Sequence, residues 1–104
     1  MRALFDHEGR RIGLSKERYA HILEHPEMAR MPQAIGEALL YPELVVESVG
    51  DPSVRLYYRL YERTMVGRKY VCVVVKLGRH DAFVLTAYLT DRVKRGVLLW
   101  PSEN

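Results

Sequence analysis

Apolar and polar side chains alternate with a period of two along most of residues 44–100. This period is typical of β-strands, in which successive side chains point to opposite faces. Asp51-Pro52 and the glycines Gly67 and Gly78 interrupt the alternation. We therefore expect strands at residues 44–49, 54–61, 70–77 and 83–90, with a short last strand at residues 97–100. Because the connections are short, neighbouring strands are expected to pair antiparallel.

Residues 1–42 show a different pattern, with apolar positions at helical spacing. Ser15 is a good N-cap for a helix over residues 16–25, and Pro26 should end that helix. Pro32 suits the first turn of a second helix over residues 32–41. Before both helices, residues 3–14 predict a short hairpin that turns at residues 7–9. The expected fold is a single α+β domain over residues 1–104, with two N-terminal helices packed on one face of an antiparallel sheet of four, or with the last strand five, strands.

The composition fits one globular domain. Hydrophobic residues make up 48% of the 104 residues. The longest purely apolar run, Val71–Val75, is too short to cross a bilayer, and the N-terminus lacks the apolar core of a signal peptide. Cys72 is the single cysteine, so no intrachain disulfide can form, and its Val-rich surroundings favour a packed thiol over a nucleophile. These features predict a cytoplasmic protein without a membrane partner.

Charge is distributed unevenly along the chain. Residues 1–53 carry six Lys or Arg against nine Asp or Glu, whereas residues 54–96 carry ten against three. A basic half of this kind indicates a polyanionic partner such as nucleic acid, although a solvated basic surface gives the same count.

The strand at residues 54–61 carries arginines and tyrosines in alternation on one side: Arg55, Tyr57, Arg59 and Tyr61. Guanidinium groups pair with phosphates, and tyrosine rings can stack on unpaired bases. The alternative reading is that these are ordinary strand tyrosines with arginines that keep the face soluble. Both readings stay open.

A second row of polar side chains is expected on that same face, which we predict to be the one left open by the helices. The row comprises Lys76 from one strand and Thr86, Tyr88 and Thr90 from the next, followed by Arg92 and Lys94 in a basic segment. Cations can bind the charge of a phosphate while hydroxyl groups fix its orientation. The prediction requires that all these strands present their polar groups on one surface.

His21 and His25 lie near the end of the first expected helix, within the sequence HILEHPE. Either imidazole could transfer protons near neutral pH, and a capping or surface role is the alternative for each. The pair also matches the H-x-x-E-H pattern of one class of zinc peptidase. Because Pro26 truncates the helix and no third ligand stands out, the sequence predicts neither a metal nor another cofactor.

The order of these segments resembles a known family. The segments HILEHPE, LYYRLY, a Val-rich strand ending in Lys76, and TAYLT followed by KRG are similar to the small phage and bacterial nuclease domains of the barnase–EndoU–colicin–RelE-like group. The resemblance covers residues 14–100. It implies helices on a four-stranded antiparallel sheet and metal-independent RNA cleavage, often by toxins or effectors. It also implies that His21 or His25 matches the family's helix histidine, and that Lys76 and Thr86 match its strand positions.

Together these observations predict a metal-independent ribonuclease in which an RNA 2′-hydroxyl attacks the adjacent phosphate. The expected catalytic residues are His21, His25, Arg59, Lys76, Thr86 and Tyr88. The expected RNA-binding residues are Arg55, Tyr57, Tyr61, Thr90, Arg92 and Lys94. RNA is the expected partner, with an antitoxin or immunity protein and a homodimer as further partners to consider. The alternative is a module of the same fold that binds nucleic acid or protein without catalysis.

Overall fold

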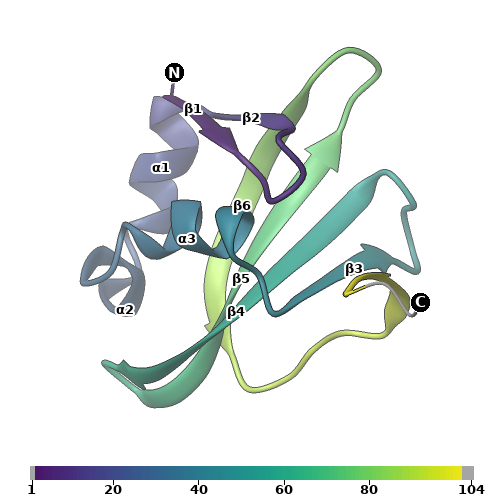
Figure 1. The fold of residues 1–104 in the computed structure, drawn as a ribbon. Helices are drawn as coiled ribbons and strands as arrows, with labels where there is room; N and C mark the ends of the chain where they lie inside the picture. The colour runs from purple at the N-terminus through teal and green to yellow at the C-terminus, as the bar shows by residue number, and fades with distance from the viewer. Residues whose placement is uncertain (1, 102–104) are drawn as a thin grey trace.

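A seven-stranded mixed sheet forms the centre of the computed structural model, which describes residues 2–101 (Figure 1). The strands are β1 (Arg2–Phe5), β2 (Arg11–Leu14), β3 (Leu44–Ser48), β4 (Val54–Thr64), β5 (Gly67–Leu77), β6 (Ala82–Thr90) and β7 (Gly96–Trp100). Their order across the sheet is β1-β2-β6-β5-β4-β3-β7. All neighbours pair antiparallel except β2 and β6, which run parallel and meet at Gly13 and Phe83.

Three short helices pack on one face of the sheet: α1 (Lys16–Ile22), α2 (Pro26–Ala29) and α3 (Ala34–Leu40). Ser15 caps α1, and its hydroxyl accepts a hydrogen bond from the Arg18 backbone N–H at 3.1 Å. The helix expected over residues 16–25 ends at Ile22, because His25 takes an extended conformation before Pro26. Pro26 then occupies the first turn of α2.

The expected fold class is wrong. The sheet has seven strands and one parallel contact, in place of four or five strands that are all antiparallel. The difference arises at the chain ends, where the β1–β2 hairpin joins the sheet beside β6 and β7 returns beside β3. These added strands are only four or five residues long, too short for an alternation to reveal which neighbour they pair with.

The main core lies between the helices and the sheet. Each helix contributes buried apolar residues to it, among them Ile22, Met28 and Leu39. From the sheet it receives Tyr57 of β4 and the β5 residues Val71, Val73 and Val75. The residues at alternate positions of β5 therefore define the helix-facing side of every strand paired with it.

A smaller apolar cluster covers the opposite face, where we expected an open polar surface. Val46, Leu56, Tyr58 and Cys72 are buried there. The connection between β6 and β7 packs over this cluster, and the Lys94 backbone N–H donates a hydrogen bond to the Tyr58 hydroxyl at 2.9 Å. Burial raises the pKa of the Cys72 thiol to about 11, which keeps it protonated near neutral pH.

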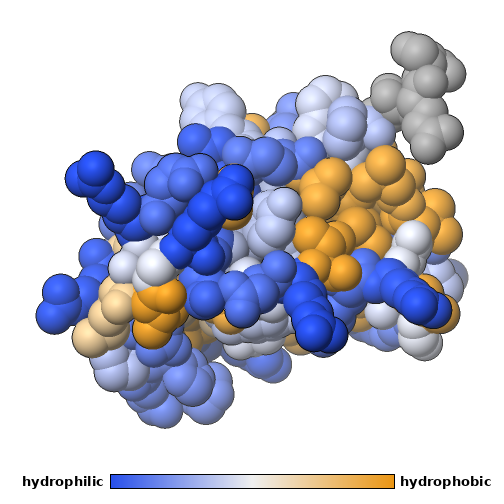
Figure 2. Space-filling model, turned by 90° about the horizontal axis from the view of Figure 1, so that it is seen from below, coloured by the Kyte–Doolittle hydropathy of each residue, from blue (hydrophilic) through white to orange (hydrophobic). Residues whose placement is uncertain are grey.

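Outside these two cores, the molecular surface carries both apolar and hydrophilic side chains. Viewed from below, apolar side chains gather on one part of the surface and hydrophilic side chains lie beside them (Figure 2). Within residues 2–101, each helix is too short or too polar to cross a membrane.

We expect Gly96 to control the attachment of β7. A Cβ atom at this position would lie 2.1 Å from the Glu47 carbonyl oxygen and 2.5 Å from Val46 Cγ1. Gly96→Ala should therefore lower the free energy of unfolding by about 1–3 kcal/mol, as measured by urea denaturation. Gly50→Ala is the matched control, because a Cβ atom there meets nothing within 4 Å. Equal stability of the two variants would show that β7 is not held against β3 in this way.

Candidate functional site at the turn between β1 and β2

The residues expected to form one RNA-binding surface lie on two opposite faces of the sheet. Tyr57 of β4 aligns with Val73, and Arg59 aligns with Val71, so the arginine–tyrosine stripe faces the helices. Lys76 lies at an alternate position of β5 and therefore projects to the other side. The prediction of one common face is wrong. Both faces of β4 carry apolar or aromatic side chains, and the face with the arginine–tyrosine stripe is the one that packs toward the helices.

Most residues of the second row do share a face of the sheet, the face away from the helices. Thr86, Tyr88 and Thr90 align with β5 positions on the same side of that strand as Lys76. However, Lys76 Nζ binds Asp51 Oδ2 at 2.7 Å, and the Thr90 hydroxyl accepts a hydrogen bond from the Arg92 backbone N–H at 3.1 Å. These contacts pair Lys76 and Thr90 within the protein.

Tyr88 is an exception in this row. Its hydroxyl is buried and has no hydrogen-bond partner among residues 2–101, and burial raises the pKa of the phenol above its ordinary value. Lys94 Nζ lies 5.9 Å from the centre of the Tyr88 ring, a distance typical of a cation–π contact. The Tyr88 ring and the Lys94 ammonium group therefore lie together on this face. Lys76, on the same face, is paired with Asp51.

The two histidines expected to be catalytic, His21 and His25, lie apart from the arginine–tyrosine stripe and from the second row of polar side chains. The His21 side chain is 70% exposed and its Nδ1 lies 3.5 Å from Glu24. His25, between α1 and α2, is 62% exposed and its Nδ1 lies 3.8 Å from Glu27. Among the residues that the structure describes, neither histidine makes a hydrogen bond or ion pair with the expected strand residues. Since α1 ends at Ile22, the H-x-x-E-H pattern is not presented by one helix.

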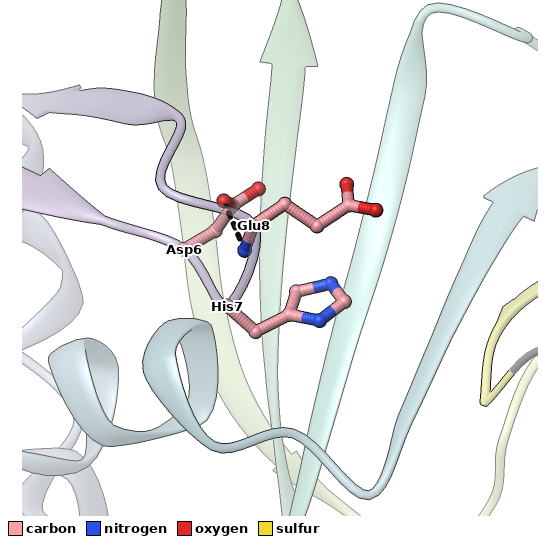
Figure 3. A group of neighbouring side chains, drawn as sticks. All are labelled: Asp6, His7 and Glu8. Carbon is pink, nitrogen blue, oxygen red and sulfur yellow. Dashed lines mark hydrogen bonds between the residues drawn. The ribbon is translucent and has the colours of Figure 1, made fainter.

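A different group of side chains meets at the turn between β1 and β2, where Asp6 fixes the backbone (Figure 3). Asp6 is only 2% exposed. Its Oδ1 accepts hydrogen bonds from the backbone N–H groups of Glu8 at 3.0 Å and Arg10 at 2.8 Å. The Tyr57 hydroxyl donates to Asp6 Oδ2 at 2.7 Å and so ties the turn to the middle of β4. Burial, and then the nearby Asp6 carboxylate, raise the pKa of Tyr57 above its ordinary value, so this hydroxyl remains a donor.

His7 and Glu8 extend from this anchored turn in the same direction (Figure 3). The centre of the His7 ring lies 5.0 Å from that of Trp100 in β7 and 6.2 Å from that of Tyr57. Glu8 Oε1 lies 3.7 Å from Arg55 Nη1. One imidazole nitrogen and one carboxylate oxygen of this pair lie within 4.8 Å of each other. An imidazole, a carboxylate and a guanidinium thus share one site.

Arginines of β4 and of the turn between β1 and β2 carry buried nitrogens without a hydrogen-bond partner in the described residues. Arg55 Nε, Arg59 Nε and Arg10 Nη1 are buried and have no hydrogen-bond partner in the described part of the chain. Arg59 uses one other nitrogen, because its Nη1 donates to the Tyr41 carbonyl at 2.7 Å. Buried donors are normally paired, and two of these arginines do have carboxylates nearby, because Arg10 Nη1 lies 3.5 Å from Asp6 and Arg55 Nη1 lies 3.7 Å from Glu8.

Asp6, His7 and Glu8 together have the donor set of a small metal site. The fit is poor, because both Asp6 oxygens already accept hydrogen bonds from three groups of the protein. Ligation would require Asp6 to give up bonds that hold the turn. The arrangement is better suited to proton transfer by His7 and Glu8 next to the Arg55 cation.

Sequence reasoning treated residues 7–9 only as a hairpin turn and therefore missed His7 and Glu8. The available signal was the run Asp6-His7-Glu8, in which three titratable side chains follow a short strand. Arg55 and Arg59 were identified, but on the wrong face. Comparisons of the chain with protein-family models, with curated proteins and with solved structures found no match.

Removing the Tyr57 hydroxyl should loosen the turn. Tyr57→Phe leaves a buried carboxylate with one donor fewer, and we expect the free energy of unfolding to fall by about 1–3 kcal/mol. Chemical denaturation measures this change. Tyr70→Phe is the control, because the Tyr70 hydroxyl makes no hydrogen bond with another residue between 2 and 101. A Tyr57→Phe protein as stable as the control would mean that Asp6 does not depend on this bond.

The pairing of Lys76 with Asp51 can be tested by titration. The Lys76 hydrogen bond, helped by Ser53, lowers the pKa of Asp51 from 3.8 to about 2. The depressed pKa favours the folded state above pH 3.8, and this contribution is lost as the pH falls through about 2. In Lys76→Met the Asp51 midpoint, followed by carboxyl NMR, should move upward toward 3.8. An unchanged midpoint would show that Lys76 is free to bind another anion.

Proposed function

We propose that this chain is a metal-independent ribonuclease-like domain whose reacting groups lie at the turn between β1 and β2. The observation that carries the proposal is the approach of His7 and Glu8 to within 4.8 Å of each other, with Arg55 3.7 Å from the Glu8 carboxylate. Two proton-transfer groups beside a phosphate-binding cation are the requirements of RNA cleavage without a metal.

In the proposed reaction, Glu8 accepts the proton of an RNA 2′-hydroxyl as its oxygen attacks the adjacent phosphorus. A bond forms between the 2′-oxygen and phosphorus, and the bond from phosphorus to the 5′-oxygen of the next nucleotide breaks. Protonated His7 donates a proton to that leaving oxygen. The products are a 2′,3′-cyclic phosphate and a 5′-hydroxyl. Arg55 would stabilise the added negative charge on the phosphate.

Aromatic groups beside the turn support recognition of single-stranded RNA. Trp100 is 39% exposed, and its ring lies next to His7. A partly exposed indole can stack on an unpaired base while the adjacent groups engage the phosphate. The excess of ten cations over three anions in residues 54–96 favours association with the nucleic acid backbone.

The resemblance to the barnase–EndoU–colicin–RelE-like group stays a prediction, as do the toxin or phage-effector role, the partner antitoxin and the homodimer. The proposal shares the reaction of that group but assigns it to other residues. His21, His25, Lys76, Thr86 and Tyr88 have no part in the proposed proton transfers, because the structure places them away from His7 and Arg55 or in contacts of their own.

Cleavage of single-stranded RNA in EDTA tests the proposal. Several RNAs with different bases should be cut by the wild-type protein. His7→Ala should lower the rate by about 100-fold or more, since a general acid or base typically contributes that much. His21→Ala is the matched control, an exposed histidine with its own carboxylate partner, and should retain the wild-type rate.

Circular dichroism of each variant separates loss of function from loss of fold. Full activity in His7→Ala, with activity lost instead in His21→Ala or His25→Ala, would move the reacting groups to the helix end and contradict the proposal. Absence of wild-type cleavage, combined with binding that weakens as salt rises, would support the alternative of a binding module without catalysis.

A further inference from the structure

A cationic cleft lies at the corner of the sheet where the start of β2 meets the turn between β5 and β6. Its volume is about 450 Å³. The charged and titratable residues in its lining are Arg10, Arg11, Arg79, His80 and Asp81. We propose that this cleft binds a second phosphate of the RNA strand, next to the phosphate that reacts at the turn between β1 and β2; the inference rests on the proposed function.

The turn between β5 and β6 is held closed by its own contacts. The Gly78 backbone N–H donates a hydrogen bond to the Asp81 carbonyl at 2.7 Å. A Cβ atom at Gly78 would lie 2.3 Å from Asp81 Oδ1, so the Asp81 carboxylate packs directly against the glycine. Arg79 and His80 lie between these two residues and are exposed. A closed turn thus presents a guanidinium and an imidazole to the cleft.

The charge around the cleft is strongly positive. Three arginines line it against a single carboxylate, that of Asp81. Arg11 and Arg79 form no ion pair with any residue between 2 and 101, unlike Lys69 and Lys76, which bind aspartates at 2.6 and 2.7 Å. Two arginines without an ion-pair partner in the described residues are suited to a phosphate, which accepts several arginine hydrogen bonds at once.

Arg10 connects this cleft to the candidate site. It lines the cleft, and its Nη1 lies 3.5 Å from Oδ2 of Asp6, the residue that anchors the turn carrying His7 and Glu8. The same Nη1 has no hydrogen-bond partner within the described residues. Arg10 therefore stands between the two positions, where a continuous sugar–phosphate backbone would pass from one to the other.

The size of the cleft also fits this ligand. A volume of about 450 Å³ lies within the range of small-molecule sites and accommodates a phosphate with its sugar. Leu77 and Ala82 contribute apolar surface to the lining, and the arginines contribute donors. The chemistry selects a phosphodiester without reading the base, since the contacts engage the backbone.

Binding of a 2′-O-methyl RNA decamer tests the cleft independently of cleavage, because this strand has no free 2′-hydroxyl to react. Its affinity is measured by fluorescence anisotropy at several salt concentrations for the wild type and for Arg11→Ala/Arg79→Ala. The double variant should bind about tenfold more weakly, and its slope of log affinity against log salt should fall by ~0.7 for each phosphate that the protein no longer neutralises. Arg63→Ala/Arg68→Ala removes the same charge from the distant hairpin between β4 and β5 and should have a much smaller effect.

Affinity equal to the wild type in Arg11→Ala/Arg79→Ala, or an equal loss of affinity in both double variants, overturns the proposal. So does a lack of wild-type binding. Cleavage of unmodified RNA is measured on the same proteins. If RNA is cleaved but the decamer binds without using Arg11 and Arg79, the cleft proposal fails and the proposed function stands. If binding depends on Arg11 and Arg79 but no RNA is cleaved, the proposed function fails and the phosphate site stands.

Discussion

The buried hydrogen bond between Tyr57 and Asp6 is the interaction on which the candidate site depends. It joins the middle of β4 to a turn 51 residues earlier in the chain, at 2.7 Å. A buried carboxylate must be fully paired to be tolerated, and Asp6 meets this requirement with two backbone N–H groups and one hydroxyl. The same bonds fix the directions of His7 and Glu8. The pairing of the buried Asp6 carboxylate thereby holds a turn from which Glu8 reaches Arg55 and His7 lies beside Glu8.

The strands β3 to β6 could be predicted from the alternation of side chains, because each is long enough to show a period of two. The number of strands in the sheet could not. β1, β2 and β7 have four or five residues each, and their partners are decided by contacts far along the chain, such as that of Gly13 with Phe83. The predicted helix boundaries differ from the observed ones near Pro26. The first helix ends earlier than expected, and Pro26 begins the short helix α2.

Residue types in the candidate site were easier to predict than their arrangement. Arg55, Arg59 and Tyr57 were recognised as a stripe on one side of a strand, and they do share a side. The stripe could not be assigned to a face, since the other side of β4 carries Leu56 and Tyr58, which are buried as Tyr57 is. Hydrophobicity therefore did not distinguish the two faces. His7 was missed because its partners come from β4 and β7, at least 50 residues away in sequence.

Cations of this protein fall into two groups according to their partners. Lys69 and Lys76 bind carboxylates of neighbouring turns and so stabilise the fold. Arg10 and Arg55 lie farther from their carboxylates, at 3.5 Å from Asp6 and 3.7 Å from Glu8, and with Arg59 they retain buried nitrogens without hydrogen-bond partners in the region from residue 2 to 101. The row of Thr86, Tyr88 and Thr90 and the arginines of β4 consequently lie on different faces of the sheet. We therefore assign the chemistry to the helix-facing side of β4.

A structure of the protein bound to a 2′-deoxy oligonucleotide, which cannot undergo attack by a 2′-hydroxyl, tests this assignment most directly. We predict a phosphate bonded to Arg55 and within hydrogen-bond reach of His7, with a base beside Trp100. A phosphate bound on the opposite face, between Lys76 and Thr86, would contradict it.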